Sequence, residues 1–205
     1  MMTLYITFDY LHKNKLSLET NMEVSHIAAS RSPSKLYLEE GSFISVENAI
    51  MALIVKSAND VATVVAEHIS GTEREFAKLM TKYARDIGMS KTTFKNASGL
   101  PNRAQMTTAR DISKLSYNLI SNFPKEYKLF KTEKFVWKGK TYKTHNHLMN
   151  SYEGADGIKT GYLAVERYAL AASIKRKNRR LIGIASGFET KKSRSKESAK
   201  LLSWG

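Results

Sequence analysis

Residues 45–70, SVENAIMALIVKSANDVATVVAEHIS, decide how this chain folds. Apolar residues recur at helical spacing both before and after the polar run Ser57–Asp60. Ser, Asn and Asp are poor residues for a helix interior, because their side chains compete for backbone hydrogen bonds, but good residues for its first position. The pattern therefore predicts two buried helices joined by a tight polar turn that carries Ser57 and Asn59.

Such a turn is compatible with two interpretations. A rigid pair of helices that presents a hydroxyl and an amide is a good foundation for a binding or catalytic site. Polar turns of this kind also simply join helices. The stretch by itself leaves both interpretations open.

Length and composition indicate an ordinary globular protein. The 205 residues are enough for one sizeable core, and 42% of them are hydrophobic. There is no cysteine, which excludes disulfides and thiolate metal sites and suits a protein of the cell envelope. The first fifteen residues lack the basic start of a signal peptide, and no stretch approaches the roughly 20 apolar residues needed to cross a membrane.

The net charge of +14 indicates an anionic environment or partner. Many of the basic residues, from Lys175 to Lys200, crowd the C-terminal end. No aromatic residues are interleaved with them and no nucleic-acid motif is present, so we interpret them as a solvated basic face and expect no nucleic-acid partner.

Helix signals are clear along the chain. Thr72 followed by Glu75 is a capping box, and Thr108 with Asp111 is a second start signal. We expect Leu201 and Leu202 to face inward on the last helix. The predicted helices begin at residue 2 and end near Lys13–Lys15, run from Thr72 to Gly88, from Thr108 to Pro124, and over Lys191–Trp204.

Strand signals dominate the second half of the chain, where the apolar period changes toward two. The predicted strands lie around Val24–Ala28, Leu36–Leu38, on both sides of a turn at Lys138–Lys140, at Tyr168–Ile174 and at Leu181–Ala185. The layout over residues 1–205 is thus a mainly helical lobe, 45–127, followed by an antiparallel sheet with a closing helix, 128–205. This is the α+β class.

A second motif lies about a hundred residues after the polar turn. Lys159-Thr160-Gly161 offers a point positive charge suited to a carboxylate, a hydroxyl, and a glycine that lets a ligand backbone approach a sheet edge. This tripeptide is common by chance, but S-x-N on a helix–helix turn followed by K-T-G on a sheet edge is far more specific. The two are signatures of active-site serine penicillin-binding enzymes and class A β-lactamases.

The resemblance extends over nearly the whole chain. The stretches SANDVATVVAEHISGTEREFAKLM, GMSKTTFKNASGL, TTARDISKLSYNLI and HNHLMNSYEGADGIKTGY resemble D-alanyl-D-alanine carboxypeptidases of the low-molecular-mass penicillin-binding type. The resemblance implies a penicillin-binding-protein/β-lactamase-like fold whose helical lobe and sheet clamp a peptidoglycan stem peptide ending in D-Ala-D-Ala. It implies that a serine attacks the penultimate carbonyl, D-Ala leaves and water hydrolyses the acyl-enzyme.

The resemblance also assigns roles to the five motif residues. Ser57 is expected to relay a proton to the leaving amine, and Asn59 to hold the substrate amide and the catalytic lysine. Lys159 and Thr160 are expected to bind the terminal carboxylate. The strand from Gly161 is expected to pair with the peptide. No cofactor is implied.

The third signature of the family, S-x-x-K with the nucleophile and its base, is expected before Met1, because Met1–Tyr5 resembles the run that follows it. The matches at Ser32–Lys35 and Ser193–Lys196 are interpreted as coincidence. We therefore expect a partial transpeptidase-like catalytic domain without the C-terminal β-rich domain of many relatives. We expect it to be inactive as given, with β-lactams as ligands if the nucleophile is restored, and cell-envelope or periplasmic by family.

Alternatives of other classes remain. A non-catalytic peptidoglycan-binding relic of the same fold is the main one, and a β-lactamase or esterase ranks below it. His145 and His147 could share one face of a strand, but no carboxylate partner is evident and we expect no metal site. After K-T-G, Glu166 and Arg167 replace the small residues and Gly typical of the family, which we expect to perturb the rim of the site.

Overall fold

The structure is a computed structural model that describes all residues from Met1 to Gly205. Its helices are α1 Met2–His12, α2 His26–Ala29, α3 Val46–Met51, the π-helix η1 Ala52–Lys56, α4 Asn59–Ser70, α5 Glu73–Asp86, α6 Ala109–Asn122, the 3₁₀ helices η2 Glu126–Lys131 and η3 His147–Asn150, and α7 Lys191–Trp204. Its strands are β1 Asn21–Glu23, β2 Phe43–Ser45, β3 Lys134–Trp137, β4 Lys140–Lys143, β5 Ala155–Leu163, β6 Arg167–Arg176 and β7 Arg179–Phe188.

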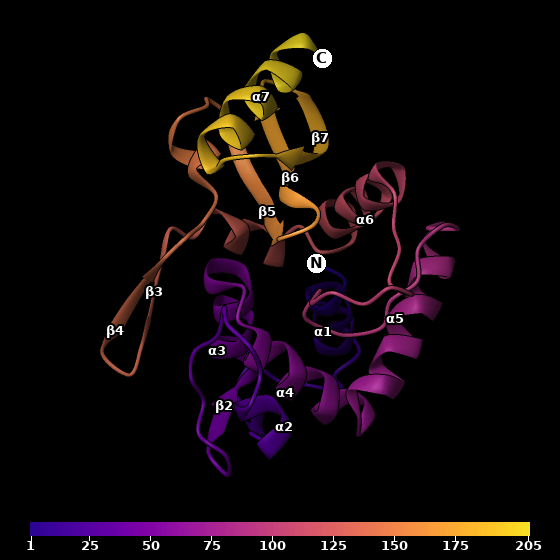
Figure 1. The fold of residues 1–205 in the computed structure, drawn as a ribbon, viewed down its shortest axis with the longest axis vertical. Helices are drawn as coiled ribbons and strands as arrows, with labels where there is room; N and C mark the ends of the chain where they lie inside the picture. The colour runs from indigo at the N-terminus through magenta and orange to yellow at the C-terminus, as the bar shows by residue number, and fades with distance from the viewer.

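Two parts of the chain face each other in space (Figure 1). Helices α1 to α5 form one part, and the antiparallel sheet β5-β6-β7 with α7 packed on it forms the other. The hairpin β3-β4 projects to one side, and α6 lies beside the sheet. Helices and antiparallel sheets in this order confirm the predicted α+β class.

Helix α1 is the centre of the core. Its residues from Met2 to Phe8 are all buried, so this helix is enclosed on every side rather than lying on a surface. The hydroxyl of Thr3 is satisfied by the carbonyl of Ala97 at 2.6 Å, and the rings of Tyr5 and Phe8 pack edge-on against Phe123. The predicted helix is confirmed, with its end at His12.

The predicted pair of helices in 45–70 is confirmed. The first begins at its cap Ser45 and widens into the π-helix η1, and Ser57 follows in the left-handed conformation with φ 56°. Helix α4 then begins at Asn59, and its first N–H donates to the carbonyl of Ser34 at 2.7 Å. A loop from elsewhere in the chain thus satisfies one of the free N–H groups of α4.

The predicted strands around Val24–Ala28 and Leu36–Leu38 are wrong. The small sheet is instead formed by β1 and β2, and Ser25 caps the short helix α2. Residues 36–38 pair with a side chain rather than a strand: the buried carboxylate of Asp60 accepts N–H bonds from Leu36 at 3.1 Å and Leu38 at 3.2 Å. We call this contact of Asp60 with the N–H groups of Leu36 and Leu38 the Asp60 clip, and no periodicity in the sequence predicts it.

The other predicted elements are largely confirmed. Thr72 and Thr108 cap α5 and α6 through their hydroxyls, and the hairpin turn and α7 lie where expected. Leu202 is buried but Leu201 is 41% exposed, because adjacent helical residues point about 100° apart. His145 and His147 do not share a strand face, since His145 lies in a bend and His147 begins η3.

We expect Asp60→Ala to destabilise the protein by about 3 kcal/mol, because it leaves buried N–H groups of Leu36, Leu38 and Val61 without their acceptor. Asp60→Asn should cost less, since one oxygen remains. Urea unfolding followed by circular dichroism measures both. The exposed helical residue Asp86, changed to Ala, is the control and should shift stability by less than about 0.5 kcal/mol. Equal losses of unfolding free energy in Asp60→Ala and Asp86→Ala would contradict a stabilising role of the Asp60 clip.

Candidate functional site

The two sequence motifs meet at one point between the helical part and the sheet. The Nζ of Lys159 on β5 donates to the Oγ of Ser57, although the residues are 102 positions apart in the chain. The left-handed backbone of Ser57 places it at the end of η1. The same lysine also contacts the carbonyl of Thr160 at 3.3 Å. The structure therefore brings S-x-N and K-T-G together, as the spacing alone could not show.

Asn59 lies on the wall of the same site, and the residue is 9% exposed. Its Nδ2 donates to the carbonyl of Ser32 at 2.9 Å, while Ser34 donates to the carbonyl of Lys56 at 2.9 Å. These bonds tie the 32–34 loop to the turn. A cavity of about 50 Å³ is lined by Ser57, Asn59 and Lys159 together with residues of α1 and the 97–98 loop.

Strand β5 is an edge strand of the sheet β5-β6-β7. Its register places Thr160 opposite Leu170 and Gly161 opposite Ala169 on β6. A Cβ at Gly161 would meet Ala169 at 3.6 Å, an ordinary contact, so packing inside the sheet does not demand glycine there. The other edge of β5 has no strand partner and can receive an extended peptide.

The site is strongly cationic. Burial, with the charge of Arg194 second, lowers the pKa of Lys159 to about 8. Arg194 comes from α7, is 2% exposed and donates to the carbonyl of His145 at 2.6 Å; burial lowers the pKa of its guanidinium too. Burial and the neighbouring charge of Lys159 lower the pKa of His145 to about 4. Lys159 and Arg194 form no ion pair with a carboxylate, so a bound anion would stabilise their charges, whereas His145 is neutral near pH 7.

Arg194 and His145 are site residues that the sequence reasoning did not select. Arg194 was assigned to the solvated basic face, and that assignment is wrong for this residue, which is almost fully buried. A helix rich in Lys and Arg gives no pattern that singles out one buried arginine. No cluster of three or more His, Cys, Asp or Glu residues able to hold a metal ion occurs in the structure.

The two internal S-x-x-K matches do not form a serine–lysine pair. Lys35 donates to the carbonyl of Ala29 at 2.9 Å, and the serine contact to Asn59 uses the main-chain carbonyl of Ser32. Ser193 lies at the start of α7, where its hydroxyl donates to the carbonyl of Thr190 at 3.0 Å.

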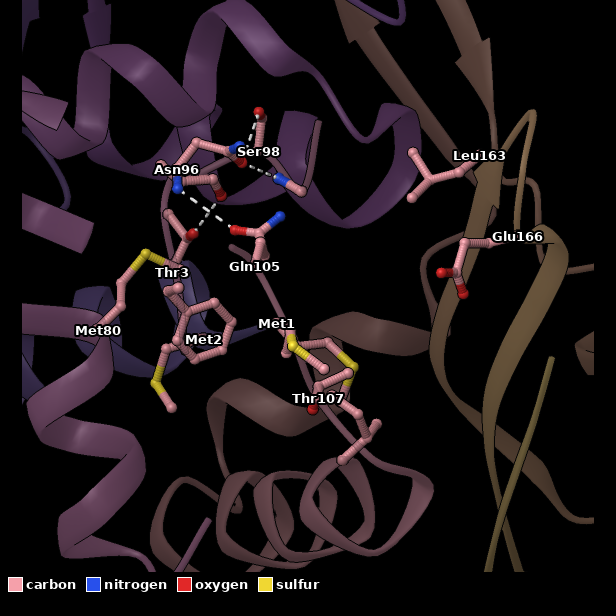
Figure 2. Close-up of a pocket in the computed structure, with 15 residues that line it drawn as sticks. Met1, Met2, Thr3, Met80, Asn96, Ser98, Gln105, Thr107, Leu163 and Glu166 are labelled. Atoms are coloured by element: carbon pink, nitrogen blue, oxygen red, sulfur yellow. Dashed lines mark hydrogen bonds between the residues drawn. The ribbon is translucent and has the colours of Figure 1, made fainter. Parts of the chain in front are cut away.

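A second and larger hollow of about 390 Å³ lies next to the first (Figure 2). The two share Met1, Thr3, Ala97 and Ser98 as walls. One rim is a loop held by its own polar side chains, with the Oδ1 of Asn96 accepting the N–H of Gly99 at 2.7 Å. The opposite rim is the β5-β6 turn, from which Leu163 and Glu166 point toward the loop.

This fold and this pairing of motifs define the class of penicillin-binding proteins. The structure of the D-alanyl-D-alanine carboxypeptidase DacD from Francisella tularensis superposes with a TM-score of 0.96 at 30% identity, covering 99% of this chain and 62% of that one. Penicillin-binding protein D2 from Listeria monocytogenes, in an ampicillin-bound form, gives a TM-score of 0.87 at 27% identity, covering 100% and 84%.

Sequence comparison is equally clear. A family model described as D-alanyl-D-alanine carboxypeptidase matches residues 1–190. The D-alanyl-D-alanine carboxypeptidase DacF of Bacillus subtilis (strain 168) is 34% identical over 210 residues, covering 98% of this chain and 53% of that protein. The chain belongs to the D-alanyl-D-alanine carboxypeptidase family, which confirms the predicted resemblance and fold, and it spans about half the length of this relative.

Because the pKa of Lys159 is lowered from 10.5 to about 8, the unfolded chain binds more protons than the folded one between these values. Stability should therefore rise with pH in this window. From about pH 7 to about pH 9.5 we expect a gain of about 1–2 kcal/mol, allowing for partial exposure of the side chain. Lys159→Met should remove this rise. Urea unfolding at both pH values measures it.

The exposed lysine Lys82, changed to Met, is the control and should retain the rise. The comparison between variants cancels the titration of tyrosines at high pH. An identical pH profile for Lys159→Met and the unsubstituted chain would mean that Lys159 is solvated rather than buried.

Proposed function

We propose that this chain is the catalytic part of a serine-type D-Ala-D-Ala carboxypeptidase that acts on peptidoglycan stem peptides. The contact of Lys159 with Ser57, at the free edge of β5, is the observation that carries the proposal. It puts a cation for the terminal carboxylate, a hydroxyl for proton transfer and a strand edge for the peptide main chain within one small site.

Recognition of the C-terminal carboxylate falls to Lys159 and Thr160. Arg194 supports it from α7, because its guanidinium adds positive potential, whereas His145, whose pKa is lowered to about 4, is neutral near pH 7 and adds only a hydrogen-bonding ring. The peptide main chain would add to β5 beyond Gly161, where a side chain on the strand would obstruct a close approach.

The proposed reaction is acyl transfer. A serine oxygen attacks the carbonyl of the penultimate D-Ala, the C–N bond breaks, and the amine of the terminal D-Ala takes up a proton; water then hydrolyses the ester. In the proposed reaction Ser57 would relay that proton, which the contact of its hydroxyl with the Lys159 ammonium supports, and Asn59, which lines the same cavity, would hold the substrate amide. Residues 1–205 contain no S-x-x-K pair at this site, so we infer that they bind the peptide but are not acylated.

The proposed partners follow from this chemistry. They are stem peptides ending in D-Ala-D-Ala, and β-lactams where a nucleophile is present, as in the ampicillin-bound relative. The proposed location is the cell envelope, where the substrate lies. No helix of the structure is both long enough and apolar enough to cross a membrane.

A non-catalytic peptidoglycan-binding module is the second candidate. The observation that favours it is the Lys159–Ser57 contact beside the free edge of β5, which can bind a peptide without any acylation. Binding without acylation fits both candidates for residues 1–205, so the decisive comparison is a chain that includes an S-x-x-K segment before Met1.

We expect N-acetyl-D-Ala-D-Ala to bind at least tenfold more weakly to Lys159→Met than to the unsubstituted chain, because a charge-assisted hydrogen bond is lost. The same peptide with a C-terminal amide should bind weakly to both, with no further loss on substitution. Calorimetric titration of this two-by-two set isolates the pairing of Lys159 with the carboxylate. An equal loss for acid and amide would contradict it.

Intact-mass spectrometry after incubation with a penicillin tests the second part of the proposal. We expect residues 1–205 to gain no adduct, because no S-x-x-K pair lies at the site. A one-to-one adduct that maps to Ser57 would mean that this residue is the nucleophile with Lys159 as its base, rather than a relay. An adduct at Ser32 or Ser193 would show that an internal S-x-x-K match is functional.

A further inference from the structure

A polar network crosses the sheet β5-β6-β7 close to Lys159. Arg180 on β7 forms a two-point ion pair with Asp156 on β5: its Nη2 lies 2.7 Å from Oδ2, and its Nη1 donates to Oδ1 at 2.9 Å. Nη1 also donates to the Oγ of Ser173 on β6, the strand between them (Figure 1). We call Asp156, Ser173 and Arg180 the Asp156 network. It links the three strands of the sheet to one another.

Tyr127 of η2 covers this network. Asp156, Ser173 and Tyr127 are all buried. The guanidinium of Arg180 lies 5.3 Å from the centroid of the Tyr127 ring, and the Tyr127 hydroxyl donates to the Oδ1 of Asp156 at 3.3 Å. A Cβ at Gly157 would meet that hydroxyl at 2.8 Å, so the close approach of η2 to the strand requires glycine there. A two-point ion pair enclosed in this way fixes the positions of both its partners.

The network lies at an irregularity of β5. The strand advances two residues from Ala155 to Gly157 while β6 advances one, so Asp156 has no residue opposite it. This is a β-bulge, a feature that re-aims the side chains of a strand. Beyond the bulge the register runs without a break through K-T-G. The bulge therefore sets which face of the sheet each residue of K-T-G occupies.

The choice of face matters because the two faces of β6 have different neighbours. Lys159 lies opposite Ala171, which packs in the main core with the helices. The next residue, Thr160, lies opposite Leu170, which packs in the smaller cluster that α7 joins. A slip of one residue would exchange the two faces of the strand. It would turn the ammonium group of Lys159 away from Ser57.

We propose that the Asp156 network positions Lys159: by fixing the bulge, it sets the phase of β5 that directs the ammonium group toward Ser57. Asp156 and Arg180 act through the strand and are positioning residues rather than catalytic ones. The consequence for peptide recognition rests on the proposed function, because it takes Lys159 to bind the terminal carboxylate. The consequence for the geometry of Lys159 does not.

The first test is the pKa of Lys159, measured by ¹³C NMR on the chain labelled at lysine Cε, with Lys159→Met to assign the signal. Asp156→Asn and Arg180→Gln each leave one charge of the pair without its partner. We expect each to loosen β5, to expose the ammonium group to water and so to raise this pKa by about one pH unit. The double variant should raise it no further than either single variant, because all three remove the same pair.

The signs of these changes separate positioning from a direct effect of charge. By charge alone, loss of the Asp156 carboxylate would lower the pKa of Lys159, and loss of the Arg180 guanidinium would raise it. Positioning predicts a rise in both variants. An unchanged or lowered pKa in Asp156→Asn would overturn the proposal. Tyr127→Phe removes only the hydroxyl bond to Asp156 and tests the same prediction, with a smaller rise, if the ion-pair variants do not fold.

Asp111→Asn is the matched control. Asp111 is a buried carboxylate on α6 that accepts from the N–H of Lys91 at 2.9 Å and from the hydroxyl of Thr92 at 2.7 Å. Its substitution should lower stability while leaving the pKa of Lys159 unchanged. The same rise in Asp111→Asn as in Asp156→Asn would show a general loosening of the fold and would overturn the positioning role.

Peptide binding is the second test. In Asp156→Asn we expect the preference for N-acetyl-D-Ala-D-Ala over its C-terminal amide to fall about two- to fivefold, as measured by calorimetric titration, whereas Asp111→Asn should keep it. If the unsubstituted chain has no such preference, the proposed function fails, and the NMR comparison still decides the role of the network. If Asp156→Asn keeps both the preference and the pKa of Lys159, this inference fails and the proposed function stands.

Discussion

A half-buried ammonium group at the boundary between helices and sheet is the constraint on which this structure depends. Lys159 is held against Ser57, and its pKa falls to about 8 because burial removes its water and Arg194 adds a second positive charge. Allowing for the partial exposure of the side chain, a shift from 10.5 to about 8 corresponds to about 1–2 kcal/mol of unfavourable electrostatics. Burial of apolar side chains in the large core around α1 and α4 offsets this unfavourable energy.

The turn after η1 shows how structure and site share the same residues. Asp60 points inward and fixes residues 36–38, Asn59 holds the 32–34 loop, and Ser57 contacts Lys159. These three side chains keep these contacts because the two buried helices hold the turn rigid. The structure confirms that the turn joins two helices, and its role as the foundation of a site stays a prediction.

Sequence reasoning succeeded where the signal was local. The caps Thr72 and Thr108, the apolar stripes of 45–70 and the turn at Lys138–Lys140 depend on neighbouring residues, and all were predicted. It failed where a distant side chain decided the outcome, as for Leu36–Leu38 beside Asp60 and for the burial of Arg194 in a basic helix. The meeting of the two motifs came from their resemblance to a family, not from any property of a hundred-residue spacing.

The β5-β6 turn contains Glu166 and Arg167, where the resemblance implies small residues and a glycine. The structure shows which conformation these two residues adopt. Arg167 has φ 61°, a left-handed conformation that glycine adopts freely and that costs an arginine of the order of 1 kcal/mol. The turn thus holds an arginine in a conformation that favours glycine, and the neighbouring Glu166 lines the larger hollow. Positive charge then lies at one end of the accessible part of β5 and negative charge at the other.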